Sequence, residues 1–354
     1  KVFFGGGTTN GGGCSKTVDI LDLQLGIWSA DSLMTEQAGA IGIAINDELF
    51  FAGGINSSPS GTTNTISIYN NNTGLWRTDT LSLPRFAMAG ACIGNIAVFA
   101  GGYLNTSNYA TTNRVDIYNS LTGTWSTASL SQARGNISAV AMGTKIYFAG
   151  GLRNANFGTL SNRVDIYDVV SGIWTTANLS QARRNISCAA VGSIALFAGG
   201  EYNFFGNLPS NEVDIYNDNT GIWSIDTLSV AHDAAIGVSV GNKILIAGGG
   251  SYSTNQFCDV VDIYSINTVG LSHEENLNTI GITQSNNELT FENLALNREF
   301  LVVIYDITGQ SVIEEKVSSN SNRISMNSLK EGIYFISIGG SHAGMNQFSK
   351  ILKT

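Results

Sequence analysis

Short apolar runs that end in a pair of glycines recur six times over the first three quarters of the chain. Successive pairs are separated by 48 or 49 residues, and this spacing predicts a repeated structural unit. Each run is almost continuously apolar, which is typical of a strand buried on both faces. The glycine pairs are Gly5-Gly6, Gly53-Gly54, Gly101-Gly102, Gly150-Gly151, Gly199-Gly200 and Gly248-Gly249.

Two further markers follow the glycine pairs. A Val-Asp-Ile-Tyr segment starts at Val115, Val164, Val213 and Val261, and the first two copies carry the variants VDIL at Val18 and ISIY at Ile66. A Gly-x-Trp segment comes next in five copies, whereas the sixth copy has Leu271 in place of tryptophan. The tryptophans are Trp28, Trp76, Trp125, Trp174 and Trp223.

Each repeat predicts four short strands. In the fourth copy these are the small apolar segment after Asn136, the run into Gly150-Gly151, the segment from Val164 and the segment that contains Trp174. The turn before the fourth strand, NSLTG or NDNTG in two copies, places glycine where a positive φ is needed. Because no helix signal interrupts the strands, the pattern predicts an all-β fold, a six-bladed β-propeller with four-stranded blades.

The order of these markers resembles the kelch repeat: an apolar run, Gly-Gly, an aromatic residue on the third strand and tryptophan on the fourth. The resemblance covers about residues 1–272 and recurs in six copies, with departures at Leu21 and Leu271. It implies a kelch-type propeller. Kelch repeats often have arginine at the entry to the innermost strand, where it packs or hydrogen-bonds loops; ligand contact is the alternative. This slot, 16 residues before each glycine pair, holds Arg85, Arg134 and Arg183, with Gln37 and His232 in two other copies.

A second domain is expected at residues 273–354, and a polar joint at residues 272–278 marks its start. Alternating segments from ELTFEN to NQFSKILK predict a small Ig-like antiparallel β-sandwich. The segments IYDITGQ from Ile304, GIYFI from Gly332 and KILK from Lys350 resemble the C-terminal sorting domain of type IX secretion. The Pro-Asn-Pro start usual in that family is replaced by ITQSNNEL, and a generic Ig-like module is the alternative.

The resemblance to the sorting domain implies export across the outer membrane of a Gram-negative bacterium. The protein would be secreted or held at the outer-membrane surface, with the type IX secretion machinery as a partner and a tail that is often cleaved. The same resemblance implies O-glycosylation at Asp-Ser/Thr-Leu tripeptides, which begin at Asp31, Asp79 and Asp226. An ordinary strand end is the alternative for these tripeptides.

The first repeat begins at its second strand. Later copies have a preceding first strand, such as AGAIGIAI before Gly53, whereas Lys1 already lies in the run into Gly5-Gly6. Since a propeller normally pairs strands from both chain ends in one blade, we expect three strands in the first blade and the innermost one upstream of Lys1, behind a signal peptide. A seventh blade upstream is an alternative.

Composition argues against several classes of function. The formal net charge is −9 and no basic stripe is present, which excludes binding to nucleic acid. No apolar run reaches the roughly 18 residues of a membrane span. The four cysteines show no metal-ligand spacing, and neither a metal nor a cofactor is expected. They are Cys14, Cys92, Cys188 and Cys258.

Residues that recur in every copy are expected to maintain the fold. The glycine pairs follow a strand but precede no helix, so they lack the helix N-terminus that binds phosphate. The tryptophans are expected to pack between blades. The third-strand aspartate recurs in register with the fold, as Asp19, Asp116, Asp165, Asp214 and Asp262, with Ser67 in the second copy.

Ligand binding is expected where the copies differ. The loops after the glycine pairs are 10 to 13 residues long, and they present aromatic residues suited to stacking on sugars or to contact with proteins. Two residues beyond the arginine slot, asparagines are expected at the mouth of the central channel. Aromatic residues that fold back over the propeller are the alternative. The candidates are Tyr103, Tyr109, Asn136, Arg153, Phe157, Asn185, Tyr202, Phe204, Phe205, Tyr252 and Phe257.

Enzymatic chemistry has few candidate residues. A copper site like that of galactose oxidase needs paired histidines with tyrosine, but only His232 lies in the propeller, while His273 and His342 lie in the joint and tail. An epimerase-like site could be built from Glu201, His232 and Arg183, although their spacing does not favour it. We therefore expect no catalytic residues and a protein- or glycan-binding module, with a carbohydrate-active enzyme as the alternative.

Overall fold

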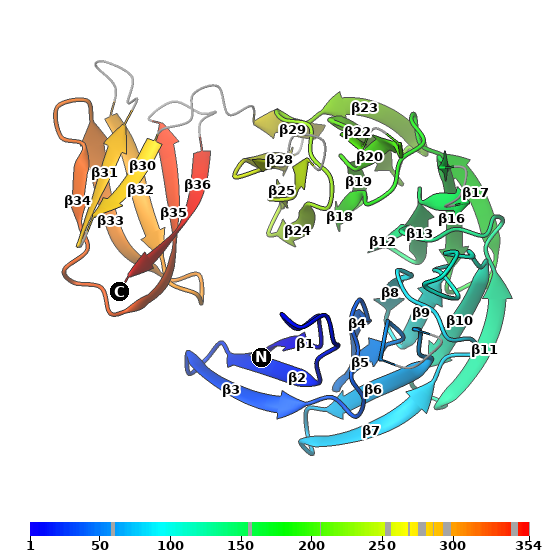
Figure 1. The fold of residues 1–354 in the computed structure, drawn as a ribbon. Helices are drawn as coiled ribbons and strands as arrows, with labels where there is room; N and C mark the ends of the chain where they lie inside the picture. The colour runs from blue at the N-terminus through cyan, green and yellow to red at the C-terminus, as the bar shows by residue number, and fades with distance from the viewer. Residues whose placement is uncertain are drawn as a thin grey trace. The chain divides into compact units, whose positions relative to one another are not determined.

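The structure is a computed structural model, and the residues that it describes form strands, bridges and turns but no helix (Figure 1). The described residues are 1–57, 61–154, 158–205, 207–251, 256–267, 270–274, 281–285, 287–292, 299–340 and 346–353. This confirms the all-β class. A helix long and apolar enough to cross a membrane is accordingly not found in these ranges.

The chain divides into two compact units. One contains Phe3–Ile20 and Ser29–Val260, and the other contains Lys1–Val2, Leu21–Trp28 and Val261–Thr354. The domain boundary between residues 272 and 273 stays a prediction.

The first three repeats each form one antiparallel sheet. The first sheet has the order β1 (Val2–Gly5), β2 (Thr17–Asp22), β3 (Ile27–Ser32). The second has the order β4 (Ile41–Ile45), β5 (Glu48–Ala52), β6 (Thr65–Asn70), β7 (Leu75–Thr80). The third has the order β8 (Ala89–Ile93), β9 (Ile96–Ala100), β10 (Arg114–Asn119), β11 (Thr124–Ser129).

The next three repeats form four-stranded sheets with the same order. The fourth sheet comprises β12 (Ser138–Met142), β13 (Lys145–Ala149), β16 (Arg163–Asp168) and β17 (Trp174–Asn178). The fifth comprises β18 (Ser187–Val191), β19 (Ile194–Ala198), β22 (Glu212–Asn217) and β23 (Ile222–Thr227). The sixth comprises β24 (Ile236–Val240), β25 (Lys243–Ala247), β28 (Val261–Asn267) and β29 (Gly270–Glu274).

Consecutive blades meet through their innermost strands. In Figure 1, strands β4, β8, β12, β18 and β24 follow one another around a common centre, and each lies against the next. The second strands are buried on both faces, as β19 shows from Ile194 to Ala198, because each lies in the middle of a sheet stacked between sheets. The fourth strands, such as β11, alternate between exposed and half-buried residues. The predicted β-propeller architecture is confirmed.

The first sheet has the three predicted strands, with one change in register. The left-handed glycine pair of this repeat is Gly6-Gly7, at φ of 76° and 103°, so the predicted pair Gly5-Gly6 is wrong by one residue. Gly5 instead ends β1, at the place of Ala52 in the second repeat. The run FFGGG therefore aligns with FFAGG, because the conformation of the pair sets the register.

Each glycine pair lets the chain turn tightly where three segments meet. At Gly101 and Gly102 the φ values are 66° and 105°, which side chains rarely adopt. The Gly102 nitrogen donates to the carbonyl of Arg134, and a Cβ on Gly102 would lie 2.7 Å from the Phe86 carbonyl oxygen. The pairs are thus structural, as expected.

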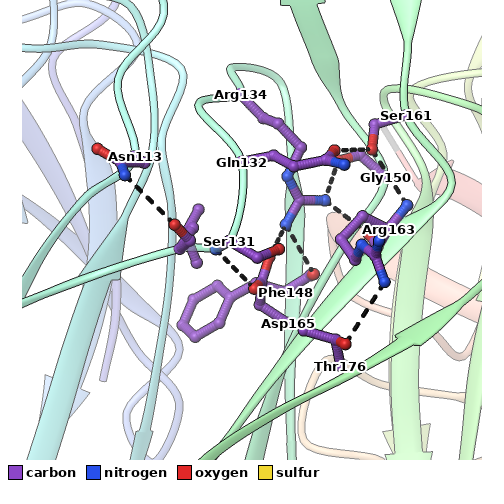
Figure 2. A network of polar contacts seen from close by, with 11 residues as sticks. Asn113, Ser131, Gln132, Arg134, Phe148, Gly150, Ser161, Arg163, Asp165 and Thr176 are labelled. Carbon is purple, nitrogen blue, oxygen red and sulfur yellow. Dashed lines mark hydrogen bonds and ion pairs between the residues drawn. The ribbon is translucent and has the colours of Figure 1, made fainter.

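The arginine slot is a buried structural anchor, as predicted (Figure 2). The Arg134 guanidinium is fully buried and forms an ion pair with Asp165. It also donates to the carbonyls of Gly150 and Arg163, both at 2.6 Å. The second carboxylate oxygen of Asp165 accepts from the Ser131 nitrogen at 2.8 Å, so one aspartate fixes the connection that enters the blade at two points. Arg183 repeats this arrangement with Asp214 and the carbonyls of Gly199 and Glu212. Arg85 forms the ion pair with Asp116, but its Nη1 has no hydrogen-bond partner among the described residues.

The second blade makes the same connection with neutral groups. Gln37 donates to the carbonyls of Gly53 and Thr65 at 2.7 and 3.1 Å, which are the equivalents of the two carbonyls bound by Arg134. The Ser67 hydroxyl donates to the Gln37 side-chain oxygen at 3.1 Å. The two departures from the repeat, glutamine and serine, are therefore partners.

Four tryptophans pack against the core of the preceding blade, as predicted, and two of them bind an aspartate of that blade. Trp28 of the first blade is instead exposed over 53% of its surface. The Trp125 indole stacks at a tilt on Tyr118 of its own blade, with centroids 4.9 Å apart, and packs against the core of the second blade. Its Nε1 donates to Asp79 on β7 at 2.8 Å, and Trp76 donates in the same way to Asp31 on β3. These aspartates begin two of the Asp-Ser/Thr-Leu tripeptides, whose glycosylation stays a prediction.

The tail forms the predicted antiparallel β-sandwich. One sheet has the order β30 (Gly281–Ser285), β31 (Glu288–Glu292), β34 (Arg323–Ser325). The other has the order β33 (Ser311–Ser318), β32 (Glu299–Tyr305), β35 (Gly332–Gly340), β36 (Asn346–Lys353). The core between them is formed from both sheets, with Phe291, Ile304 and Ile336 among its buried members.

Candidate functional site

Antiparallel connectivity brings all the variable loops to one end of the propeller. In a four-stranded blade, the loop between the second and third strands and the connection to the next blade lie at the same end. Three of these loops form small hairpins, and the rest are irregular in the described residues. The hairpins are β14 (Leu152–Asn154) with β15 (Thr159–Leu160), β20 (Glu201–Asn203) with β21 (Leu208–Pro209), and β26 (Gly250–Ser251) with β27 (Gln256–Phe257).

At this end, each of five blades adds one bridge. It joins the residue that follows the glycine pair to a residue just before the innermost strand. The bridge Phe86↔Tyr103 continues the register of Ala89↔Ala100, so it extends the ladder of the two innermost strands. We call these bridged residues the mouth pairs. They are Ala38/Ile55, Phe86/Tyr103, Gly135/Leu152, Arg184/Glu201 and Asp233/Gly250.

A belt of backbone hydrogen bonds runs beside the mouth pairs. The nitrogen of Asn136 donates to the Ala87 carbonyl, that of Asn185 to Asn136, and that of Ala234 to Asn185. All four residues have φ between 49° and 52°. The two asparagine side chains, predicted at the channel mouth, are half-buried. They therefore stand next to the mouth pairs and join neighbouring blades through their backbone.

The mouth pairs of the second to fourth blades are apolar. Phe86, Tyr103 and Leu152 are buried in one cluster, and the exposed ring of Tyr109 meets that of Tyr103 edge-on at 5.6 Å. A Cβ on Gly135 would lie 2.5 Å from the ring of Tyr103, so the glycine makes room for this ring over the fourth blade. Tyr103 is thus an internal part of the mouth, which corresponds to the alternative in which loop aromatics fold back over the propeller.

The mouth pairs of the fifth and sixth blades are charged. Arg184 binds Glu201 through Nη2 at 2.8 Å and Nε at 3.1 Å, and its guanidinium lies 4.6 Å from the ring centre of Phe204. Glu201 and Asp233 are buried, with 1% and 3% of their surface exposed. Phe204 in turn packs against the apolar cluster that contains Tyr103 of the third blade, and the charge of Arg184 opposes the rise in the pKa of Tyr103. Residues from the third, fifth and sixth blades therefore meet here.

Burial shifts the ionisation of this charged group. It raises the pKa of Glu201, and the neighbouring Asp233 carboxylate adds to the rise while Arg184 opposes it. Burial also raises the pKa of Asp233, again against Arg184. The pKa of Tyr103 rises to about 12, chiefly through burial. Ionisable groups with perturbed pKa values that lie together are typical of functional sites.

Other loop aromatics are exposed to solvent. Phe205 and Phe257 have 75% and 93% of their surface exposed, and Tyr202 has 42%. Phe205 and Phe204 meet edge-on at 5.3 Å, and Phe204 is half-buried beneath Arg184. Arg153 is exposed on β14. The remaining candidates, Phe157 and Tyr252, lie outside the described residues.

Sequence reasoning missed Arg184, Asp233 and Phe86. Each stands one residue beyond the arginine slot, and this position differs in all five blades, while the slot itself holds a structural residue. Comparing this position between the copies would have revealed it. Of the three residues considered for an epimerase-like site, Glu201 lies at the mouth, whereas Arg183 and His232 are buried in the slot.

Among the described residues, no three His, Cys, Asp or Glu side chains are grouped as ligands for a metal ion. His273 is on β29, and His342 lies outside the described residues.

Comparison with known proteins identifies both parts of the chain. Residues 262–353 match the family of secretion system C-terminal sorting domains, and residues 133–178 match the Kelch motif. The solved structure of YjhT is similar over 77% of this chain and 97% of its own, with a TM-score of 0.57 and 15% sequence identity. At this identity the similarity shows the fold alone. No curated protein sequence matches the chain.

The fold and these matches define a class of protein. It is a kelch-repeat β-propeller that carries a type IX secretion sorting domain at its C-terminal end. The sorting domain directs export to the cell surface or the exterior, and it implies contact with the secretion machinery.

Proposed function

We propose that this exported propeller is a binding module that captures a protein or glycan ligand at the end that carries the mouth pairs, and that it is not an enzyme. One observation carries the proposal: exposed aromatic side chains stand on the variable loops around a rigid, repetitive scaffold. Aromatic rings dominate the binding energy of many interfaces because they bury a large area with few rotatable bonds.

Truncation of one exposed ring tests the proposal. Phe205→Ala should weaken capture of the ligand by about tenfold or more, as expected for a central aromatic anchor. Ligands would be found with a glycan array and with extracellular proteins immobilised on beads, and affinity would then be measured by surface plasmon resonance.

Leu121→Ala is the matched control. Leu121 is as exposed as Phe205, at 76%, but it lies in the turn between β10 and β11, at the opposite end of the blade. Equal loss of binding in both variants, or no effect of Phe205→Ala on any ligand found, would contradict the proposal.

A carbohydrate-active enzyme is the second candidate, and Glu201 favours it. This buried carboxyl has a raised pKa and a second carboxyl, Asp233, beside it, which is a common setting for proton transfer. A turnover screen with the same preparation separates the two functions. Turnover that is lost in Glu201→Gln would show that the protein is an enzyme, and the proposal of a pure binding module would be wrong.

A further inference from the structure

The Glu201 carboxylate has more acceptor capacity than the protein fills. Arg184 occupies only Oε2 of Glu201, while Oε1 is buried and has no hydrogen-bond partner among the residues that the structure describes. Asp233 is the second buried carboxylate, and the next residue, Ala234, donates its nitrogen to the carbonyl of Asn185, which follows Arg184. The charge of Asp233 contributes to the raised pKa of Glu201. A buried acceptor without a donor costs about 1–3 kcal/mol, so the site favours a ligand that brings a donor.

Charge selects the kind of donor. Glu201 forms an ion pair with Arg184, and Asp233 adds a second carboxylate, so these three side chains have a formal net charge of −1. An anionic ligand is therefore disfavoured, and a single positive charge would neutralise the group. The whole chain, with a net charge of −9, attracts cations at longer range.

The surroundings select the shape of the cation. Aromatic rings flank the charged group: Phe204 lies 4.6 Å from the guanidinium and packs against the cluster that contains Tyr103. Rings of this kind bind cations through their faces and accept apolar stems along their sides. Because Glu201 and Asp233 are nearly covered, the cation must also stand at the end of a slender apolar chain. A lysine side chain has both properties, whereas an amine attached directly to a sugar ring lacks the stem.

We propose that Glu201 and Asp233 form an acceptor site for the ammonium group of a lysine side chain presented by a protein ligand, with Arg184 as the resident cation that shares Glu201 with the lysine. This inference rests on the proposed binding function and specifies its ligand as a protein. The exposed Phe205 would then contact the surface around the lysine.

Small probes test the site directly on the full chain. The probe is Nα-acetyl-lysine methylamide, titrated by NMR or calorimetry. The norleucine analogue keeps the stem and lacks the ammonium group, and it should bind about tenfold more weakly or not at all. Glucosamine carries an ammonium group without a stem and should also bind more weakly.

Variants separate recognition from support of the fold. Glu201→Gln and Asp233→Asn should each weaken the lysine probe by about tenfold, since each removes a charged acceptor. Arg184→Gln should strengthen it, because the resident cation no longer competes for Glu201. A damaged fold cannot produce this opposite sign. Asp47→Asn, which makes the same change of charge in the turn between β4 and β5 at the other end, should leave the affinity unchanged.

Several results would overturn the inference. They are equal binding of the lysine and norleucine probes, absence of binding by either, weaker binding to Arg184→Gln, and binding of glucosamine as tight as that of the lysine probe. If the lysine probe fails while Phe205→Ala still abolishes capture of a ligand, the binding function stands and only the ammonium site falls.

Discussion

Gly102 occupies a backbone conformation that only glycine adopts without strain. Its φ is 105°, and an added Cβ would meet the Phe86 carbonyl oxygen at 2.7 Å. We expect Gly102→Ala to lower the free energy of unfolding by at least about 2–3 kcal/mol, because the backbone must shift in a buried turn. Chemical denaturation would measure the loss.

The control for this substitution is Gly42→Ala on β4. Gly42 has no positive φ, and a Cβ there would meet nothing within 4 Å. Alanine at this position should be neutral or slightly stabilising, since it restricts the unfolded chain by about 0.4–1 kcal/mol. Similar losses at the two sites would show that the conformation of Gly102 does not matter.

The sequence allowed the structural residues to be predicted better than the residues of the mouth. Glycine pairs, slot arginines and tryptophans recur, so their roles follow from the repeat. Arg183 and Arg184 are neighbours of the same type, yet one is fully buried and the other reaches the mouth. Only the strand register decides which of them faces outward. The sequence indicates Tyr103 as a ligand-binding residue because it is an aromatic residue on a variable loop. Its ring lies inside the mouth because Gly135 has no side chain there.

Within a blade, the slot residue and the third-strand residue act as one unit. Arg134→Gln alone leaves Asp165 buried without its cation, and we expect a loss of about 3–5 kcal/mol in the free energy of unfolding. Adding Asp165→Ser should recover at least about half of that loss, because it reproduces the neutral Gln37–Ser67 pair of the second blade. Denaturation of the three variants would measure the coupling.

The order in which the variants lose stability tests this account. If the double variant is less stable than Arg134→Gln, the neutral pair does not replace the ion pair outside the second blade. Burial itself is unfavourable for the ion, since it lowers the pKa of Arg134 to about 10 despite the opposing effect of Asp165. The uncharged Gln37–Ser67 pair of the second blade avoids the cost of burying an ion.

The repeat predicts the bounds of most strands, but it does not predict every element. The four strands of the fourth repeat lie where its markers place them, because turn glycines and apolar runs limit each strand. The first repeat was misaligned because three consecutive glycines offer two possible pairs, and only backbone conformation distinguishes them. The small hairpins could not be predicted, because their strands have two or three residues and no periodic pattern.

For the whole molecule, the match to a sorting domain leads to a prediction about transport. A chain that ends after Glu274, the last residue of β29, lacks the sandwich and should accumulate in the periplasm of the native host. Fractionation and immunoblotting of culture medium, cell surface and periplasm would measure this. Full-length protein expressed in parallel is the control. Normal appearance of the truncated chain in the medium would contradict the sorting role.

The two kinds of polar anchor described above have different consequences for how such a protein can be rearranged. Arg134 and Asp165 belong to one repeat, so a blade that is duplicated, deleted or transplanted carries its own anchor with it. The bond from Trp125 to Asp79 joins adjacent repeats, so it survives only if the new neighbour supplies an acceptor. Ala128 and Ala177 occupy the equivalent places before Trp174 and Trp223. The buried anchor is therefore independent of the neighbouring blade, whereas the tryptophan bond at the rim depends on it.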